Sequence, residues 1–309
     1  MLTLKKERLR FGGVCGELKM TSATSISPSK SAQAITPRAA RLFNADAALS
    51  GAAAFWLLAA LAGQWAFLYY IAAFYGVSTL SGDFEVWNRL AALGRTPYVP
   101  GDAMGNVAFA AHALGAGVVA FGGALQLIPQ VRRHAPAFHR WNGRVFLLTV
   151  VALSLSGFYL VWVRRTSLDP LSTTFNGVLI LMFAFLAFRA VRARRIAVHR
   201  RWAMRLYLVS NAQWFLRVGA FSYFAISQML GNQPSFDDPF LRFWTVGCYL
   251  VPLAVLEAYL RAKDSSSPLG KGAVASGLAV FTLLMGVGIF AFGMFSQLIV
   301  SGAPLRLPG

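Results

Sequence analysis

Residues 139–163 read HRWNGRVFLLTVVALSLSGFYLVWV, a basic, tryptophan-bearing junction followed by an uncharged apolar run. A helix needs about 20 apolar residues to cross the hydrocarbon of a bilayer, and the run from Val145 to Val163 is close to that length. Tryptophan and arginine just before such a run are typical of the membrane interface. The stretch therefore predicts a transmembrane helix that begins at a basic membrane surface.

The rest of the chain repeats this pattern. Of its 309 residues 57% are hydrophobic and 13% charged, and the mean hydropathy is +0.56, well beyond the globular average. We therefore expect an all-α, polytopic transmembrane helical bundle of about seven spans, the fourth being short. Windows of sufficient length lie near 49–76, 105–128, 145–163, 174–190, 206–228, 243–260 and 273–299.

The net charge of +18 is spread between the apolar runs and forms no single patch, so it argues for membrane topology and against nucleic-acid binding. Short cytoplasmic segments carry the excess of Lys and Arg. With the amino terminus in the cytoplasm, the cytoplasmic segments hold 22 of these residues and the outer segments 6. We expect a multi-pass protein of the inner membrane, with its carboxyl terminus outside.

Three regions follow from this topology. Residues 1–46 predict a flexible basic cytoplasmic tail near anionic lipid, 47–300 the bundle, and 301–309 a short outer tail. The outer loop over 78–104 is expected to form a small lid. Cysteine usage predicts neither a disulfide nor a metal site, because Cys15 lies in the tail and Cys248 in an apolar run.

A second junction resembles the first and lies sixty residues further on, reading HRRWAMRLY over 199–207. Both junctions contain His-Arg, a tryptophan, a further arginine and an aromatic residue, and each joins two spans. We interpret this as a duplicated helical hairpin, formed by spans 2–3 and spans 4–5, within a repeat core over 105–228.

These motifs resemble a known family. Over roughly 105–228 the chain is similar to the bacterial membrane family catalogued as domain of unknown function 2306. The resemblance implies a membrane bundle and no established activity, and Ala203 departs from it where a bulkier residue is expected. It rests on Ala111-His112, Gly122 to Gln126, His139 to Arg144, Ser156-Gly157 and His199 to Arg205.

The repeated histidines admit a redox interpretation. His139 and His199 are a plausible pair of axial ligands for haem b, with nearby arginines for its propionates. Both lie about 9 to 10 Å outside their apolar runs, however, which is headgroup depth. The alternative is purely structural, because tryptophan and arginine anchor helices without any cofactor. In that interpretation Arg140, Arg144, Arg200 and Arg205 bind anionic lipid headgroups.

A second candidate site lies within the membrane, where ionisable side chains are rare and usually functional. His112 and Arg217 fall inside apolar runs, and with Asn211 they predict an outer-half site for an anion, a lipid or a quinone. Gln64, Asn176 and Gln213 are further polar side chains at membrane depth. Hydrogen bonding that merely joins helices is the competing interpretation.

No catalytic constellation is evident. Serine, histidine and carboxylate share no predictable neighbourhood, and no glycine loop follows a strand to hold phosphate. Glu257 precedes Arg261 by four residues, which predicts an ion pair within one helix. Ligand binding, haem-based redox chemistry and a structural role therefore stay open, and the oligomeric state is not predicted.

Overall fold

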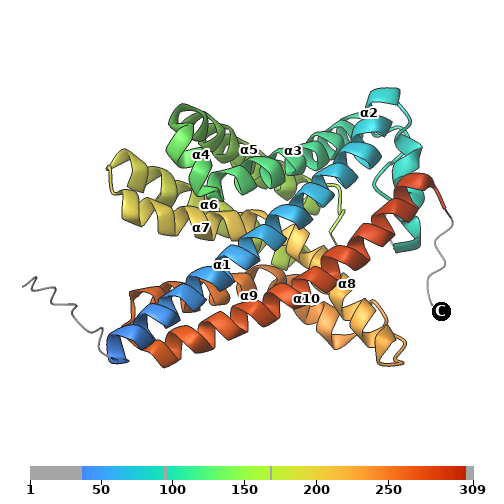
Figure 1. Cartoon of the computed structure of the whole chain (residues 1–309). Helices are drawn as coiled ribbons and strands as arrows, with labels where there is room; N and C mark the ends of the chain where they lie inside the picture. The colour runs from blue at the N-terminus through green and yellow to red at the C-terminus, as the bar shows by residue number, and fades with distance from the viewer. Residues whose placement is uncertain (1–36, 94–95, 168, 304–309) are drawn as a thin grey trace, which may run out of the picture.

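A computed structural model describes residues 37–93, 96–167 and 169–303, which form a bundle of helices without a strand (Figure 1). The predicted all-α class is confirmed. In chain order the elements are α1 (Pro37–Tyr70), a π-helical turn η1 (Ile71–Gly76), α2 (Val77–Ser81), a 3-10 helix η2 (Phe84–Leu93), α3 (Ala103–Leu127), α4 (Pro129–His134), α5 (Pro136–Trp162), α6 (Pro170–Arg192), α7 (Ile196–Ser210), α8 (Ala212–Met229), α9 (Pro239–Asp264) and α10 (Pro268–Ser301).

The predicted tails fall mostly outside the described residues. Residues 1–36, which include Cys15, and residues 304–309 are not described. Helix α1 already begins at Pro37, so residues 37–46 are helical although they belong to the expected flexible tail. Cys248, inside α9, is buried and free.

Among the described residues, six helical segments are long and apolar enough to cross a membrane. The polytopic membrane bundle is thereby confirmed. The expected short fourth span is the uninterrupted helix α6, which has 23 residues. The six segments are Asn44–Ser81, Ala103–Leu127, Pro136–Trp162, Pro170–Arg192, Pro239–Asp264 and Pro268–Ser301.

The expected fifth span, 206–228, differs from the prediction because it is not one helix. Helix α7 ends at Ser210 and α8 begins at Ala212, with Asn211 between them at φ −100° and ψ 15°. The Asn211 amide Nδ2 donates to the carbonyl oxygen of Tyr207, 2.8 Å away, and so satisfies a backbone acceptor at the end of α7. The expected fifth span is therefore two helices joined at a polar residue, and neither is among the six described segments that could cross a membrane.

Helix boundaries follow local sequence signals. Proline occupies the start of α4, α5, α6, α9 and α10, where its missing N–H costs no helical hydrogen bond. Asp102, Asp169 and Ser267 cap α3, α6 and α10 by accepting from backbone N–H groups of the first turn.

Two long helices, α1 and α10, pack along each other across the bundle (Figure 1). Helix α3 packs on α5, α5 on α6 and α6 on α7, whereas α8 packs between α9 and α10. The pairs α3–α5 and α6–α7 are the two hairpins of the proposed repeat, and their duplication stays a prediction. Gly288 permits the closest approach, because a Cβ there would collide with the backbone of Val218 in α8.

The loop between α2 and α3 does fold over one end of the bundle. Trp87 in η2 is fully buried, and its indole Nε1 donates to the Ser78 hydroxyl at 2.7 Å. Arg89 Nη1 donates to the carbonyl oxygens of Ile299 and Val300, at 3.0 and 3.2 Å, which caps the last turn of α10. The loop thus covers one end of the bundle, and that this end is the outer face stays a prediction.

Candidate functional site

Arg217 lies on α8, two turns beyond the break. Its Nη1 donates to the Gln213 carbonyl oxygen at 2.7 Å, and its guanidinium carbon lies 5.3 Å from the centre of the Phe67 ring on α1. None of the ion pairs among the described residues involves Arg217. Its guanidinium thus has no carboxylate of the described chain within 4 Å. In an apolar stretch of the sequence such a charge is costly unless another anion is present.

Three polar side chains of α1, α7 and α8 are buried without hydrogen-bond partners in the described residues. Gln64 is 0% exposed, Trp214 1% and Tyr207 4%. Both side-chain atoms of Gln64, the Tyr207 hydroxyl and the Trp214 indole N–H form no hydrogen bond. Since buried polar groups are nearly always paired, several such groups in one region require an explanation. We call Gln64, Tyr207 and Trp214 the core polar cluster.

The residues of the core polar cluster lie on three helices, α1, α7 and α8. The Gln64 amide of α1 lies next to the Tyr207 hydroxyl of α7, close enough to interact with it, although the geometry of a full hydrogen bond is not met. The Trp214 ring of α8 lies directly against Gly63, the neighbour of Gln64. Residues three apart on a helix lie on adjacent turns. Phe67 follows Gln64 by three on α1 and Arg217 follows Trp214 by three on α8, so the contact of Phe67 with Arg217 lies one turn further along the same α1–α8 interface.

The break at Asn211 adds polar backbone to this region. Trp214 and Phe215 donate their N–H groups to the Asn211 carbonyl oxygen, which starts α8. The first two N–H groups of α8 have no acceptor within the helix, and this end carries the positive part of the helix dipole. Discontinuous membrane helices use such ends to bind substrates and ions.

His112 has a different environment from Arg217. Its Nδ1 lies 2.9 Å from the Ser156 hydroxyl, which links α3 to α5, and its ring lies beside Gly157. No contact joins His112 to Arg217 among the described residues. His112 thus bonds Ser156, Asn211 bonds Tyr207 and Arg217 bonds Gln213, so each of the three predicted residues has a different partner. Asn176, also predicted as part of the polar set, is buried in α6 with its side-chain oxygen unpaired.

The two repeated histidines lie at the basic end of the bundle. His199 Nδ1 donates to the Ala187 carbonyl oxygen of α6 at 2.9 Å, which leaves its Nε2 free. His139 Nδ1 is buried without a hydrogen-bond partner in the described residues. The two rings lie within electrostatic range of each other, together with Arg132 and Arg140. No contact joins the two rings among the described residues, and their pairing in the haem interpretation stays a prediction.

The repeated arginines share one local geometry. Arg144 lies over the Trp141 ring at 4.8 Å, and Arg205 over the Trp202 ring at 4.6 Å. Arg205 differs because it also forms a two-bond ion pair with Glu257 of α9, at 2.7 and 2.9 Å. Its guanidinium is therefore engaged within the protein, whereas Arg144 has no carboxylate partner among the described residues.

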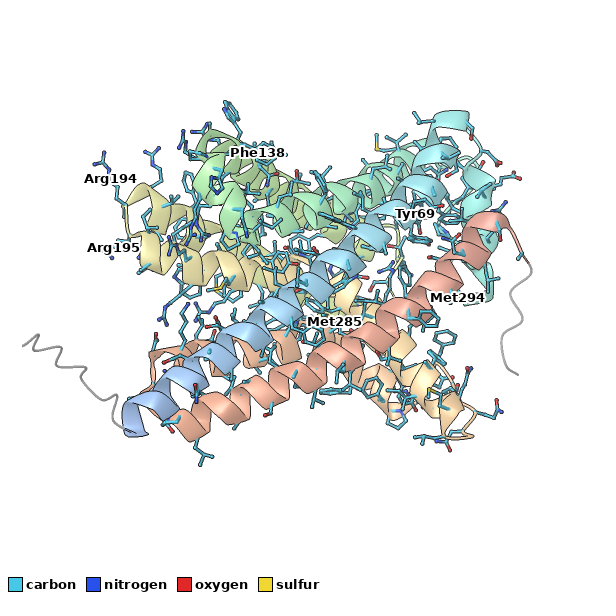
Figure 2. The ribbon with its side chains drawn as sticks, in the orientation of Figure 1. Tyr69, Phe138, Arg194, Arg195, Met285 and Met294 are labelled. Atoms are coloured by element: carbon cyan, nitrogen blue, oxygen red, sulfur yellow. The ribbon has the colours of Figure 1, made fainter. Side chains whose placement is uncertain are left out.

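The predicted pair of Glu257 with Arg261 is wrong, since Glu257 bonds Arg205 across two helices. The reason is orientation, because the Glu257 side chain faces α7. Arg140 and Arg200, the other predicted headgroup ligands, are exposed. Figure 2 shows Arg194 and Arg195 projecting from the same end of the bundle, at the turn between α6 and α7. Within the described residues no group of three or more metal-ligating side chains gathers.

Comparison with known proteins supports the membrane assignment. Residues 109–259 match the DUF2306 family, described as predicted membrane proteins. The suspected resemblance is confirmed, and the matched segment extends beyond the repeat core into α9. The DUF2306 segment contains Tyr207, Trp214 and Arg217 but not Gln64, which α1 contributes from outside it. No curated protein matches the chain, and no solved structure matches it.

Proposed function

We propose that this integral membrane protein binds an anionic ligand inside its bundle, at Arg217 beside the break between α7 and α8. The observation that carries the proposal is a guanidinium in an apolar stretch of the sequence with no carboxylate partner among the described residues. A charge in such a stretch is expensive unless it is compensated, so an arginine without a carboxylate partner favours an external anion.

The neighbouring groups suit such a ligand. A guanidinium binds a carboxylate or phosphate through parallel N–H donors, and a site that excludes water strengthens the attraction. Gln213 and Phe67 hold the Arg217 side chain in place. The start of α8 carries the positive part of its helix dipole, which favours negative charge. Hydrogen bonding that only joins helices accounts for neutral polar residues, not for an uncompensated cation.

The test is a ligand-dependent melting experiment on purified protein in detergent. Butyrate, inorganic phosphate and phosphatidylglycerol are compared at constant ionic strength with butyramide, the neutral analogue of butyrate. At least one anion should raise the melting temperature of the wild type but not of Arg217→Gln, because a ligand stabilises the state that binds it. Arg200→Gln, an exposed arginine at the basic end, serves as the matched control and should respond like the wild type.

The anionic proposal is overturned if no anion stabilises the wild type more than it stabilises Arg217→Gln. Equal stabilisation of both proteins by the quinone menadione, with no effect of the three anions, would instead indicate a neutral ligand and would also overturn it.

A second function, haem-based redox chemistry, is favoured by one specific observation. Metal-binding histidines usually donate one ring N–H to a carbonyl and ligate through the other nitrogen. His199 has this arrangement through Ala187, and His139 presents a buried, unpaired Nδ1 within electrostatic range. Two imidazoles are sufficient axial ligands for a b-type haem.

Absorption spectroscopy separates this function from the first. Protein purified from haem-supplemented cells should show a Soret band that His139→Ala and His199→Ala both abolish. His134→Ala should keep the band, because His134 lies in α4 and belongs to neither repeated junction. A wild type without a Soret band after haem supplementation would exclude the second function.

A further inference from the structure

We infer that the core polar cluster is a second subsite of the proposed anion site, and that the ligand is an acid with a neutral oxygen on the carbon next to its carboxylate. This class comprises 2-oxo and 2-hydroxy acids. The inference rests on the proposed function, because it assigns the carboxylate to Arg217 and the neutral oxygen to Gln64, Tyr207 and Trp214.

The core polar cluster is buried, and its polar atoms lack partners in the part of the chain that the structure describes. Gln64, Tyr207 and Trp214 are each more than nine-tenths buried, and their polar atoms are unpaired within the described residues. They offer four N–H or O–H donor hydrogens and only a few acceptor positions. A set of buried donors from three different helices fits a ligand atom that accepts hydrogen bonds.

The positions of the cluster residues along α1 and α8 place them close to the cation. Trp214 precedes Arg217 by three residues on α8, and Gln64 precedes Phe67 by three on α1. One helical turn rises about 5.4 Å, so the neutral donors lie roughly one turn from the cation. A separation of this order suits a carboxylate on Arg217 and an oxygen of the adjacent carbon at the cluster. The rings of Phe67 and Trp214 supply apolar walls for a short hydrocarbon body.

The stability of the ligand-free protein distinguishes a ligand-binding cluster from polar groups that only join helices. A buried hydroxyl with a partner, including an internal water, stabilises the empty protein, and its removal is destabilising. A buried hydroxyl held for a ligand is a cost to the empty protein. Tyr207→Phe should therefore leave the melting temperature of the ligand-free protein unchanged or raise it, while weakening ligand binding.

The experiment compares 2-oxobutyrate with butyrate, which differ only in the neutral oxygen. The wild type should bind 2-oxobutyrate about tenfold more tightly, the effect of roughly one hydrogen bond. Tyr207→Phe should reduce this preference toward unity without changing the affinity for butyrate. Arg217→Gln should lose both ligands. Tyr223→Phe is the matched control, since this tyrosine also faces a polar partner but bonds Asp238 outside the cluster, and it should keep the preference.

Three results decide between the proposals. If butyrate binds through Arg217 but the wild type shows no preference for 2-oxobutyrate, the inference is overturned and the anion site stands. If neither acid binds, the inference fails, and the melting experiment with phosphate and phosphatidylglycerol decides whether the anion site stands. If Tyr207→Phe lowers the melting temperature of the ligand-free protein and keeps the preference, the cluster is structural and the inference fails. Trp214→Phe gives an independent repeat should Tyr207→Phe not fold.

Discussion

Asp102 is the residue at which stability should depend most simply on pH. Its carboxylate accepts the Gly105 N–H at 2.9 Å and the Arg164 Nε at 2.8 Å, and these contacts hold its pKa below the usual 3.8. An ionised group with a depressed pKa stabilises the fold above its unfolded pKa, and this contribution is lost as the pH falls through the folded pKa.

Substitution of Asp102 by asparagine should therefore lower the melting temperature at neutral pH and have a shrinking effect below about pH 3.8. Melting curves of both proteins in detergent between pH 7 and pH 2.5 provide the measurement. A difference in melting temperature that stays constant over this range would show that the Asp102 charge is not involved.

Only some residues of the candidate site can be recognised from the sequence. Arg217 and Asn211 are recognisable from sequence because a charge and an amide in an apolar run violate the hydropathy of a span. Tyr207 and Trp214 are not, because their rings belong to any apolar window and only the structure shows that their polar atoms are unpaired. The separation of His112 from Arg217 depends on helix rotation, which hydropathy does not determine.

At the scale of helices, α7 and α9 are joined by ion pairs at the basic end of the bundle. Arg205 bonds Glu257 with two hydrogen bonds and is largely buried, whereas Arg201 and Asp264 are more exposed. Arg205→Ala should lower the free energy of unfolding by about 1 to 3 kcal/mol, since Glu257 loses its partner. Arg201→Ala should cost about 0 to 1 kcal/mol.

Chemical unfolding in mixed micelles can compare the two variants under one set of conditions. The double exchange Arg205→Glu with Glu257→Arg should recover part of the stability lost by either single change. Equal losses for Arg205→Ala and Arg201→Ala would mean that the burial of the first pair adds nothing.

The interruption of the fifth span should be visible in backbone dynamics. The N–H groups of Ala212 and Gln213 open a helix and have no intrahelical acceptor. Hydrogen exchange at 210–213 should therefore be faster than in the middle of α10, over 281–288, where the helix is continuous. Equal protection of the two segments, measured by mass spectrometry in detergent, would contradict a broken span.

The break between α7 and α8 is a helix boundary that hydropathy alone does not predict. The window 206–228 has the length of one span, but α7 and α8 are not among the described segments long and apolar enough to cross a membrane, so a crossing there stays a prediction. Its division depends on one side-chain hydrogen bond, from Asn211 to the Tyr207 carbonyl, which competes with the helical ladder. Helix α6 shows the opposite case. Its apolar middle part is short, but polar turns that a hydropathy window does not include lengthen the helix.

At the scale of the whole molecule, the membrane bundle is predictable because length and apolar content leave few alternatives. The orientation stays a prediction that rests on the excess of basic residues at one end. Single cysteines at Asn232 and Ser266, in a protein lacking Cys15 and Cys248, should test it. An impermeant maleimide applied to intact cells should label Asn232→Cys and not Ser266→Cys, and the reverse pattern would invert the topology.

The arrangement of the molecule places one uncompensated arginine beside a broken helix and a set of unpaired buried donors. The central claim is that this region binds an anion through Arg217. Equilibrium dialysis of radiolabelled butyrate against purified wild type and Arg217→Gln, at constant ionic strength, measures it most directly. We predict saturable binding of one butyrate per chain to the wild type and none to Arg217→Gln, and equal binding to both proteins would contradict the account.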